Sequence, residues 1–242
     1  MPAGPLEGQV VLVTGATGGL GRSVVKRLLD SGASVAAAYR DEARYRDLVE
    51  LVGEAKNALS GFKADVTSEE DVQGLVEAVV RRHGRIDAIL NLVGAYRGGS
   101  EIAATAVDDW DFLIRTNLRS AFLCCRAVLP VMAKAGRGRI VSVAARPAVE
   151  SRGRAKSGAY AVSKAGVIVL TQAIAEETRR SGITATCIVP ATIDTPRNRA
   201  EITGGDPSKW APPDDVAAVI VFLISDAAAV TSGAVIPVYG KS

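Results

Sequence analysis

The chain is poor in the residues that build several common kinds of site. Its 242 residues include one histidine, His83, and three cysteines, Cys124, Cys125 and Cys187. A lone histidine flanked by arginines suits a helix end better than a catalytic triad, and three cysteines without metal-ligand spacing cannot complete a disulfide framework. We therefore expect no metal site, and a reducing, cytoplasmic compartment.

Net charge is also low, and long apolar runs are missing. The formal charge is +3, and the basic residues stand near acidic ones or are scattered, which argues against nucleic acid as a partner. The longest apolar run, 216–224, is too short to span a bilayer, and the N-terminal region has no signal-peptide pattern. We expect a cytoplasmic protein that acts on a small-molecule substrate, with neither nucleic acid nor membrane as partner.

Aromatic residues make up only 5% of the chain, whereas 48% is apolar and dominated by Val, Ala, Leu and Ile. Short apolar runs alternate with longer stretches of helical spacing, and this pattern is typical of parallel strands joined by helical crossovers. Strands are expected at 10–13, 35–39, 86–90, 140–144 and 184–189, and helices at 21–31, 72–82, 107–133 and 157–180. The predicted fold class is α/β, a Rossmann-type doubly wound parallel sheet flanked by helices, as a single domain over 1–242.

The segment 191–213 is irregular, because it is rich in proline and contains Gly204 and Gly205. A long loop inside a compact domain is usually functional or disordered. We interpret it as a possible substrate lid, the alternative being a surface excursion.

A glycine-rich turn follows the first predicted strand, where residues 14–21 read Thr-Gly-Ala-Thr-Gly-Gly-Leu-Gly. Glycines let the backbone approach a pyrophosphate, and a helix N-terminus supplies free amide donors. The strand before and the helix after give this pattern the context that a dinucleotide site requires.

Cofactor choice is predicted from the end of the second strand. An acidic side chain there would bind the ribose hydroxyls of NAD, and an arginine would accommodate the extra phosphate of NADP. Arg40 favours NADP(H), although Asp41 beside it keeps NAD(H) open.

Tyr160 and Lys164 lie four residues apart, which puts both on one face of a helix. A phenol titrates near pH 10 in model peptides, and a neighbouring ammonium makes it a better proton donor or acceptor at neutral pH. The pair is therefore a candidate for proton transfer.

Six ordered motifs together resemble the short-chain dehydrogenase/reductase superfamily over essentially the whole chain. Its glycine turn matches Thr14 to Gly21, its adenine-contacting Asp matches Asp65, and its Asn-Asn-Ala-Gly stretch appears as Asn91-Leu92-Val93-Gly94. Its helix Asn, its Tyr-x-x-x-Lys and its Pro-Gly-x-x-x-Thr match Asn117, Tyr160 with Lys164, and Pro190 to Thr195.

The resemblance implies residue roles. Tyr160 would exchange a proton with the substrate, Lys164 would lower the pKa of that tyrosine and hold the nicotinamide ribose, and Asn117 would anchor a relay water. Ile193 and Thr195 would bind the carboxamide. The implied cofactor-binding set is Gly15, Thr17, Gly19, Leu20, Gly21, Arg40, Asp65, Val66, Asn91, Val93, Tyr160, Lys164, Pro190, Ile193 and Thr195.

One position departs from the family pattern, because Ala145 stands where a serine polarises the substrate carbonyl. A missing donor would handicap reduction of a simple ketone by a few kcal/mol, but not of an electron-poor ring. The dihydropteridine reductase branch also has alanine there, and its Pro-Val-Thr-Leu-Asp-Thr-Pro-Met-Asn-Arg is similar to residues 190–199. That branch has an Asp where Arg40 stands and prefers NADH.

These patterns predict an NAD(P)H-dependent reductase of a small carbonyl, imine or quinonoid substrate, including a pteridine-like one. The alternatives are an ordinary alcohol dehydrogenase or 3-oxoacyl-acyl-carrier-protein reductase with a substitute for the serine, and a catalytically silent cofactor-binding protein. The family resemblance also implies a homodimer or homotetramer, built through two long helices and the final strand at 235–238.

Overall fold

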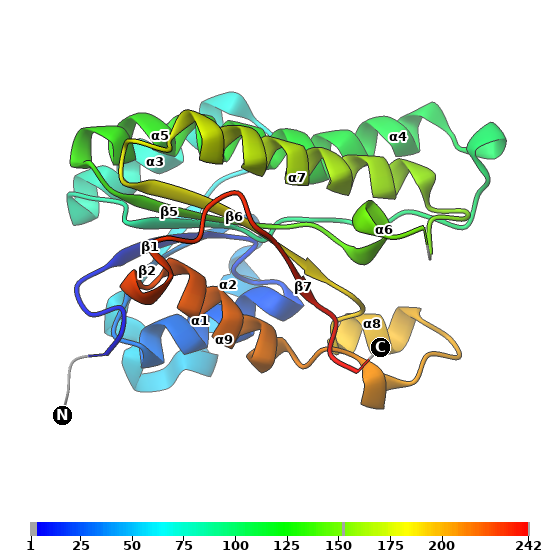
Figure 1. Ribbon diagram of the computed structural model, residues 1–242. Coiled ribbons are helices and arrows are strands. Elements are labelled where there is room, and N and C mark those ends of the chain that lie inside the picture. Colours follow the sequence, from blue (N-terminus) through cyan, green and yellow to red (C-terminus); the bar gives the residue numbers. More distant parts are fainter. Residues whose placement is uncertain (1–3, 152, 242) are drawn as a thin grey trace.

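A computed structural model describes residues 4–151 and 153–241, and it consists of one sheet between two layers of helices (Figure 1). All seven strands are parallel, in the order β3-β2-β1-β4-β5-β6-β7. The strands are β1 Val10–Thr14, β2 Ser34–Tyr39, β3 Leu59–Lys63, β4 Ala88–Asn91, β5 Gly138–Val143, β6 Ile183–Pro190 and β7 Val235–Val238. The predicted doubly wound single domain is confirmed.

Helices cover both faces of this sheet. One layer holds α1 Gly19–Asp30, α2 Glu42–Val52 and α9 Pro213–Ile224, and the other holds α3 Glu69–His83, α4 Val107–Leu113, α5 Ser120–Ala135 and α7 Gly158–Glu177 (Figure 1). Two short helices, α6 Arg146–Val149 and α8 Pro196–Glu201, follow β5 and β6. Each layer seals its own apolar core against the central strands, which are buried on both faces.

The chain reverses its winding direction between β1 and β4, which are hydrogen-bonded neighbours although two strands separate them in sequence. In open parallel sheets ligands bind at the carboxyl ends of the strands beside this switch point. The fold therefore directs attention to the segments after Thr14 and Asn91.

Some elements of the fold were not predicted, and the bounds of others differ from the prediction. Strand β3 and helix α2 were not predicted, because β3 alternates poorly and α2 buries only Leu48 fully. The single helix expected at 107–133 is interrupted by a π-helical segment, Ile114–Arg119. Residues 191–213 are more regular than expected, since they contain α8 and a short turn at Pro207–Lys209.

Helix α7 is long and apolar enough to cross a membrane by length and composition alone. Half of the qualifying residues are buried inside the fold, and the helix packs on β6 and β5. It is therefore a core helix of this fold.

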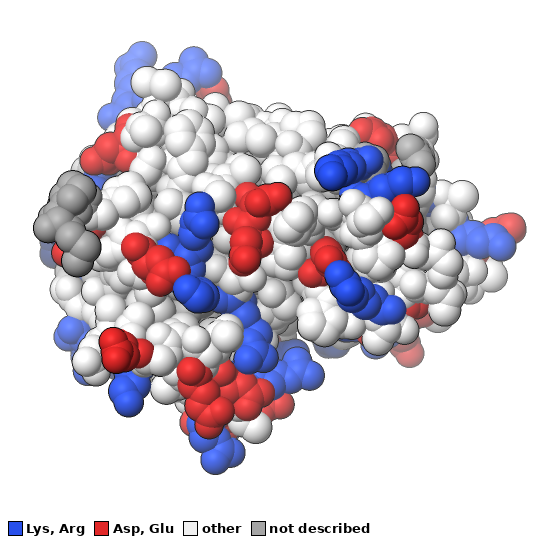
Figure 2. Space-filling view, turned by 90° about the horizontal axis from the view of Figure 1, so that it is seen from below, with Lys and Arg blue, Asp and Glu red and all other residues white. Residues whose placement is uncertain are grey.

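On the face seen in Figure 2, acidic and basic side chains are intermixed without one sign dominating.

Candidate active site

The turn after β1 leaves no room for side chains. Gly15 has a φ of +68°, and a Cβ on Gly21 would stand 2.1 Å from the Gly15 carbonyl oxygen. A Cβ on Gly19 would lie 2.7 Å from Cγ2 of Thr195. No acidic side chain stands in the first turn of α1, so its free amide groups suit an anion. This bare cradle fits the pyrophosphate of a dinucleotide.

A cleft of about 670 Å³ opens beside this turn. Six residues predicted to bind a cofactor line it, namely Gly15, Thr17, Arg40, Asp65, Val66 and Val93. Two further arginines, Arg44 from α2 and Arg197 from α8, line it as well. Three guanidinium groups around one cleft suit a ligand that carries several phosphates.

The side chains after β2 have separate tasks. Asp41 caps α2, because its Oδ1 accepts hydrogen bonds from the backbone amides of Ala43 at 2.9 Å and Arg44 at 3.2 Å. Arg40 is 74% exposed and lies 3.8 Å from Asp65, a loose ion pair of little strength. The guanidinium of Arg40 is thus available to a ligand, while the carboxylate of Asp41 is engaged by its helix.

Asp65 is held by its own loop. Its Oδ1 accepts two hydrogen bonds from Thr67, one from the amide and one from the hydroxyl, both at 2.9 Å. Burial of the carboxyl alone would raise its pKa, but the Thr67 hydrogen bonds and the charges of Arg40 and Arg115 lower it. Asp65 is therefore an ionised hydrogen-bond acceptor beside the cleft.

At its inner end the cleft reaches Gly94, where Lys164 and Asn117 meet. A Cβ on Gly94 would lie 3.0 Å from Nζ of Lys164 and 3.4 Å from Oδ1 of Asn117. The side-chain amide of Asn117 makes two hydrogen bonds with the backbone of Ala95, accepting from its N–H at 2.7 Å and donating to its carbonyl at 3.0 Å. Asn117 lies in the π-helical segment, a feature frequent at functional sites.

Lys164 is almost completely buried, and its Nζ donates to the carbonyl of Val143 at 2.8 Å. Burial lowers its pKa to about 8, against a smaller opposing effect of Cys187. The ammonium therefore loses its proton more readily than an ordinary lysine.

Tyr160 lies one turn before Lys164 on α7. Its ring meets that of Tyr96 edge to face, with centroids 5.0 Å apart and planes at 81°. Ser163 links this region to the asparagine, since its hydroxyl bonds the Tyr160 carbonyl at 2.7 Å and accepts from Asn117 at 2.9 Å.

The expected lowering of the Tyr160 pKa by Lys164 is wrong for this structure. Burial, with a smaller effect of Tyr96, raises the pKa of Tyr160 to about 12. The reason is that burial of Tyr160 itself disfavours the charged phenolate, while Nζ of Lys164 is bonded to the Val143 carbonyl. Tyr160 is thus firmly protonated at neutral pH.

Ser142 and Ser157, two serines near Ala145 in sequence, do not supply the missing hydroxyl, because each is bonded to another group. Ser142 accepts from Asn91 inside the sheet, and Ser157 donates to the carbonyl of Gly153 in its own loop. Ala145 itself is 7% exposed and caps the short helix α6. The departure seen in the sequence is therefore kept in the fold.

Other predicted residues lie beside the cleft without lining it. Asn91 points from the sheet toward α5, since it donates to Cys125 of that helix at 3.3 Å and to Ser142 of β5 at 3.2 Å. Leu20 packs on the apolar core under α1, and Pro190 pairs with Val238 at the end of β6.

The segment proposed as a lid is folded back on itself. Ile193 forms a bridge with Ala211, and Thr195 caps α8 while its side chain lies against Gly19. Trp210 is 8% exposed beneath this loop. The segment therefore rests on the glycine turn with its two ends tied together.

Sequence reasoning missed four residues of the site. Arg44 lies in the first turn of α2, directly after the strand end that carries Arg40, so it could have been found once α2 was recognised. Arg197, Ser163 and Tyr96 gave no comparable signal, because only the folded chain brings them to the cleft, to Asn117 and to Tyr160.

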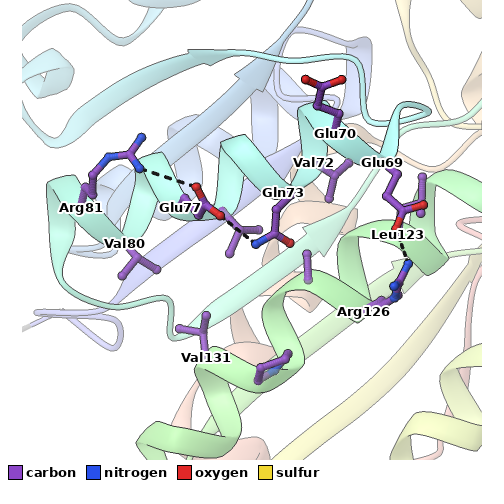
Figure 3. A pocket seen from close by; sticks show the side chains of 13 residues that line it. Glu69, Glu70, Val72, Gln73, Glu77, Val80, Arg81, Leu123, Arg126 and Val131 are labelled. Carbon is purple, nitrogen blue, oxygen red and sulfur yellow. Dashed lines mark hydrogen bonds and ion pairs between the residues drawn. The ribbon is translucent and has the colours of Figure 1, made fainter.

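A larger hollow, about 770 Å³, lies between α3 and α5 on the other side of the helical layer (Figure 3). Its floor is apolar, and its rim charges pair with one another, Glu69 with Arg126 and Glu77 with Arg81. None of the predicted site residues lines it. Within residues 4–151 and 153–241, no three His, Cys, Asp or Glu side chains gather as a metal site.

Comparison with known proteins adds independent findings. A family model described as short chain dehydrogenase matches residues 9–204. A (2S)-[(R)-hydroxy(phenyl)methyl]succinyl-CoA dehydrogenase subunit from Thauera aromatica is 32% identical over 97% of this chain and 96% of its own. A 3-oxoacyl-[acyl-carrier-protein] reductase from Thermotoga maritima is 32% identical over 97% and 98%.

A solved structure of an actinorhodin polyketide ketoreductase variant with NADPH superposes with a TM-score of 0.87. It is 30% identical, and the match covers 96% of each chain. Sequence and fold comparisons therefore agree across nearly the whole length.

Proposed function

The chain belongs to the short-chain dehydrogenase/reductase family and is an NAD(P)-dependent oxidoreductase, and from this premise we propose that it uses NADPH to reduce a small carbonyl, imine or quinonoid compound. The observation that carries the proposal is one continuous cleft. Its lining includes the bare glycine turn, Arg40 and Gly94, and Lys164 and Asn117 lie against Gly94.

NADPH is favoured by the charges around the outer end of the cleft. Arg40 is exposed and only loosely paired, whereas Asp41 is committed to capping α2. A guanidinium can hold the additional phosphate of NADPH with charge-assisted hydrogen bonds. Related structures bind this cofactor too, among them the ketoreductase solved with NADPH.

Replacing Arg40 by Ala should raise the dissociation constant of NADPH about 10- to 100-fold, since a hydrogen bond to a charged group contributes roughly 1.5–3 kcal/mol. The dissociation constant of NADH should change less than about twofold, because it lacks the phosphate. Fluorescence titration of both cofactors measures this. Arg46→Ala, at an exposed arginine of the following helix α2 that does not line the cleft, is the control. Equal losses for both cofactors would refute the assignment.

The residues of this chain supply orientation and a proton, and a bound NADPH supplies the hydride. The glycine turn would hold the pyrophosphate, Lys164 would hold the nicotinamide ribose, and Ile193 and Thr195 would hold the carboxamide. Tyr160 would give its phenolic proton to the oxygen or nitrogen of the reducible group as the substrate takes up the hydride. The resulting phenolate would be reprotonated from solvent through a water that Asn117 would anchor.

Reduction is favoured over oxidation by the state of Tyr160. A phenol whose pKa burial raises to about 12 is present as the proton donor at neutral pH, which is the form that reduction needs. Oxidation would need the phenolate, which is scarce below that pKa. The meeting of Lys164 and Asn117 at Gly94 supports this proposal over a catalytically silent cofactor-binding protein.

Ala145 narrows the substrate class. Without a hydroxyl that polarises a carbonyl, an electron-poor ring, imine or quinone is a better hydride acceptor than a simple ketone. NADPH consumption with a quinonoid dihydropterin, a quinone and a 3-oxoacyl thioester tests this. Faster turnover of the dihydropterin or quinone supports the proposal, and activity confined to the thioester would instead favour a 3-oxoacyl reductase, the activity named for the Thermotoga maritima relative.

The rate of reduction should depend on the protonation of Lys164. Burial lowers its pKa to about 8, so its charge is present below that pH and is lost as the pH rises through it. We expect kcat/KM to fall as a single group loses its proton near pH 8, because the pH dependence of kcat/KM reports the ionisations of the free enzyme. Tyr160 stays protonated throughout this range. A pH profile measures the effect, Lys164→Gln should be slower and flat, and a wild-type profile without this decline would contradict the role.

The same proposal covers location and assembly. We place the protein in the cytoplasm as a homodimer or homotetramer. Apolar side chains are exposed on neighbouring helices, with Phe122 on α5 at 45% and Val169 on α7 at 64%. Burying them against a second copy would remove apolar surface from water.

Residues 191–213 would act as the lid over the bound cofactor and substrate.

A further inference from the structure

Tyr96 is an exposed aromatic residue directly beside the proton donor. Its ring meets Tyr160 edge to face, with centroids 5.0 Å apart, yet 59% of the residue remains accessible to solvent. Exposed aromatic rings scattered over a surface need no explanation, but one in contact with a reacting group does.

The loop that carries Tyr96 is fixed at both ends. Asn117 holds Ala95 through two hydrogen bonds, and the amide of Gly99 donates to the carbonyl of Lys156 at 2.7 Å. Gly98 packs so closely under the ring that a Cβ there would lie 2.2 Å from the Tyr96 hydroxyl oxygen. The ring is therefore held in place before any substrate arrives, and little entropy is lost when it is used for binding.

The neighbouring arginine leaves the Tyr96 ring uncovered. Arg97 is drawn away by an ion pair with Asp109, and its guanidinium carbon lies 3.7 Å from the centre of the Phe112 ring. Arg97, which could otherwise stack on the Tyr96 ring, thus has other partners. The Tyr96 ring therefore remains accessible beside Tyr160.

We propose that Tyr96 is a substrate-positioning residue that selects compounds whose reducible group is attached to, or lies within, a planar conjugated ring. This inference rests on the proposed reductase function and names its substrate class. A flat ring against Tyr96 gains an aromatic contact beyond the apolar area that it buries. It also brings the reducible group to the phenol of Tyr160, and the missing hydroxyl at Ala145 matters less for such a conjugated group.

The experiment compares ligand pairs that share a six-membered ring and a polar group and differ in whether the ring is aromatic. Acetanilide and N-cyclohexylacetamide cannot be reduced, so their dissociation constants from the NADPH complex measure binding alone, through NADPH fluorescence. Acetophenone and cyclohexyl methyl ketone measure KM and kcat. We expect the wild type to prefer the aromatic member of each pair, and Tyr96→Leu to weaken binding of that member about 3- to 10-fold.

Tyr96→Leu should leave the cyclohexyl ligands within about twofold and should raise KM for acetophenone without an equal loss of kcat. Tyr96→Phe should restore the preference, since it keeps the ring. Phe222→Leu, at an aromatic residue of α9 that is 51% exposed, is the matched control. Equal weakening of both amides, or no preference in the wild type, would overturn the inference. Aromatic-selective binding with no turnover of any ketone, imine or quinonoid compound would uphold it and count against the reductase proposal.

Discussion

Replacing Tyr160 by Phe should lower kcat for reduction about 100- to 10,000-fold, the usual range for loss of a general acid. The variant keeps the ring that meets Tyr96 and removes only the hydroxyl. Since the proton can then come only from water, hydride acceptance at the substrate is no longer matched by proton donation. Steady-state NADPH consumption with the best substrate measures the loss.

The same variant should fold normally and still bind its cofactor. We expect the melting temperature to remain near its wild-type value, and the dissociation constant of NADPH to rise by no more than about 10-fold, because the variant removes one hydroxyl and leaves the glycine turn intact. Tyr45→Phe, which removes a hydroxyl from a ring stacked on Tyr39 at 4.4 Å, should retain full activity. A Tyr160→Phe enzyme within about threefold of wild type would remove Tyr160 from the mechanism.

Gly21→Ala should abolish cofactor binding and destabilise the fold. A Cβ at this position would stand 2.1 Å from the Gly15 carbonyl oxygen and 2.8 Å from backbone atoms of Ala16. These neighbours are main chain, so relief requires the whole turn to move, which costs about 1–3 kcal/mol or more. We expect the dissociation constant of NADPH to rise at least about 100-fold as two or more amide contacts to the pyrophosphate are lost.

Gly74→Ala provides the matched comparison. Gly74 lies inside α3, where a Cβ would meet nothing within 4 Å. Alanine has the higher helix propensity, so the free energy of unfolding should increase by roughly 0.5–1 kcal/mol, with cofactor affinity unchanged. Thermal unfolding and fluorescence titration of both variants measure these effects. Similar behaviour of the two would mean that Gly21 is not required by the turn.

The glycine turn and the Tyr160 to Lys164 spacing could be predicted because local chemistry dictates both. A buried strand, bare glycines and a helix start follow one another along the chain, and four residues make one helical turn. Strand β3 was harder, since it lies at the edge of the sheet and has few apolar residues to mark it. Its place is set by pairing with β2.

Electrostatic detail could not be predicted from spacing. The sequence left Arg40 and Asp41 as alternatives, and only the fold assigns Asp41 to the start of α2. The pKa of Tyr160 was expected to fall, yet burial raises it. Both outcomes depend on how deeply a group is buried and on which hydrogen-bond partner it has in the folded chain. Neither can be derived from residue spacing alone.

Direct transfer of deuterium from NADPH labelled at C4 of the nicotinamide is the most decisive measurement of the central claim. With an aryl ketone or an imine as acceptor, where the new hydrogen stands on carbon and does not exchange with water, we predict deuterium in the reduced product at a rate that falls at least about 100-fold in Tyr160→Phe. A protein that binds NADPH tightly, transfers no deuterium to any carbonyl or imine acceptor and consumes no NADPH with a quinonoid one would contradict this claim.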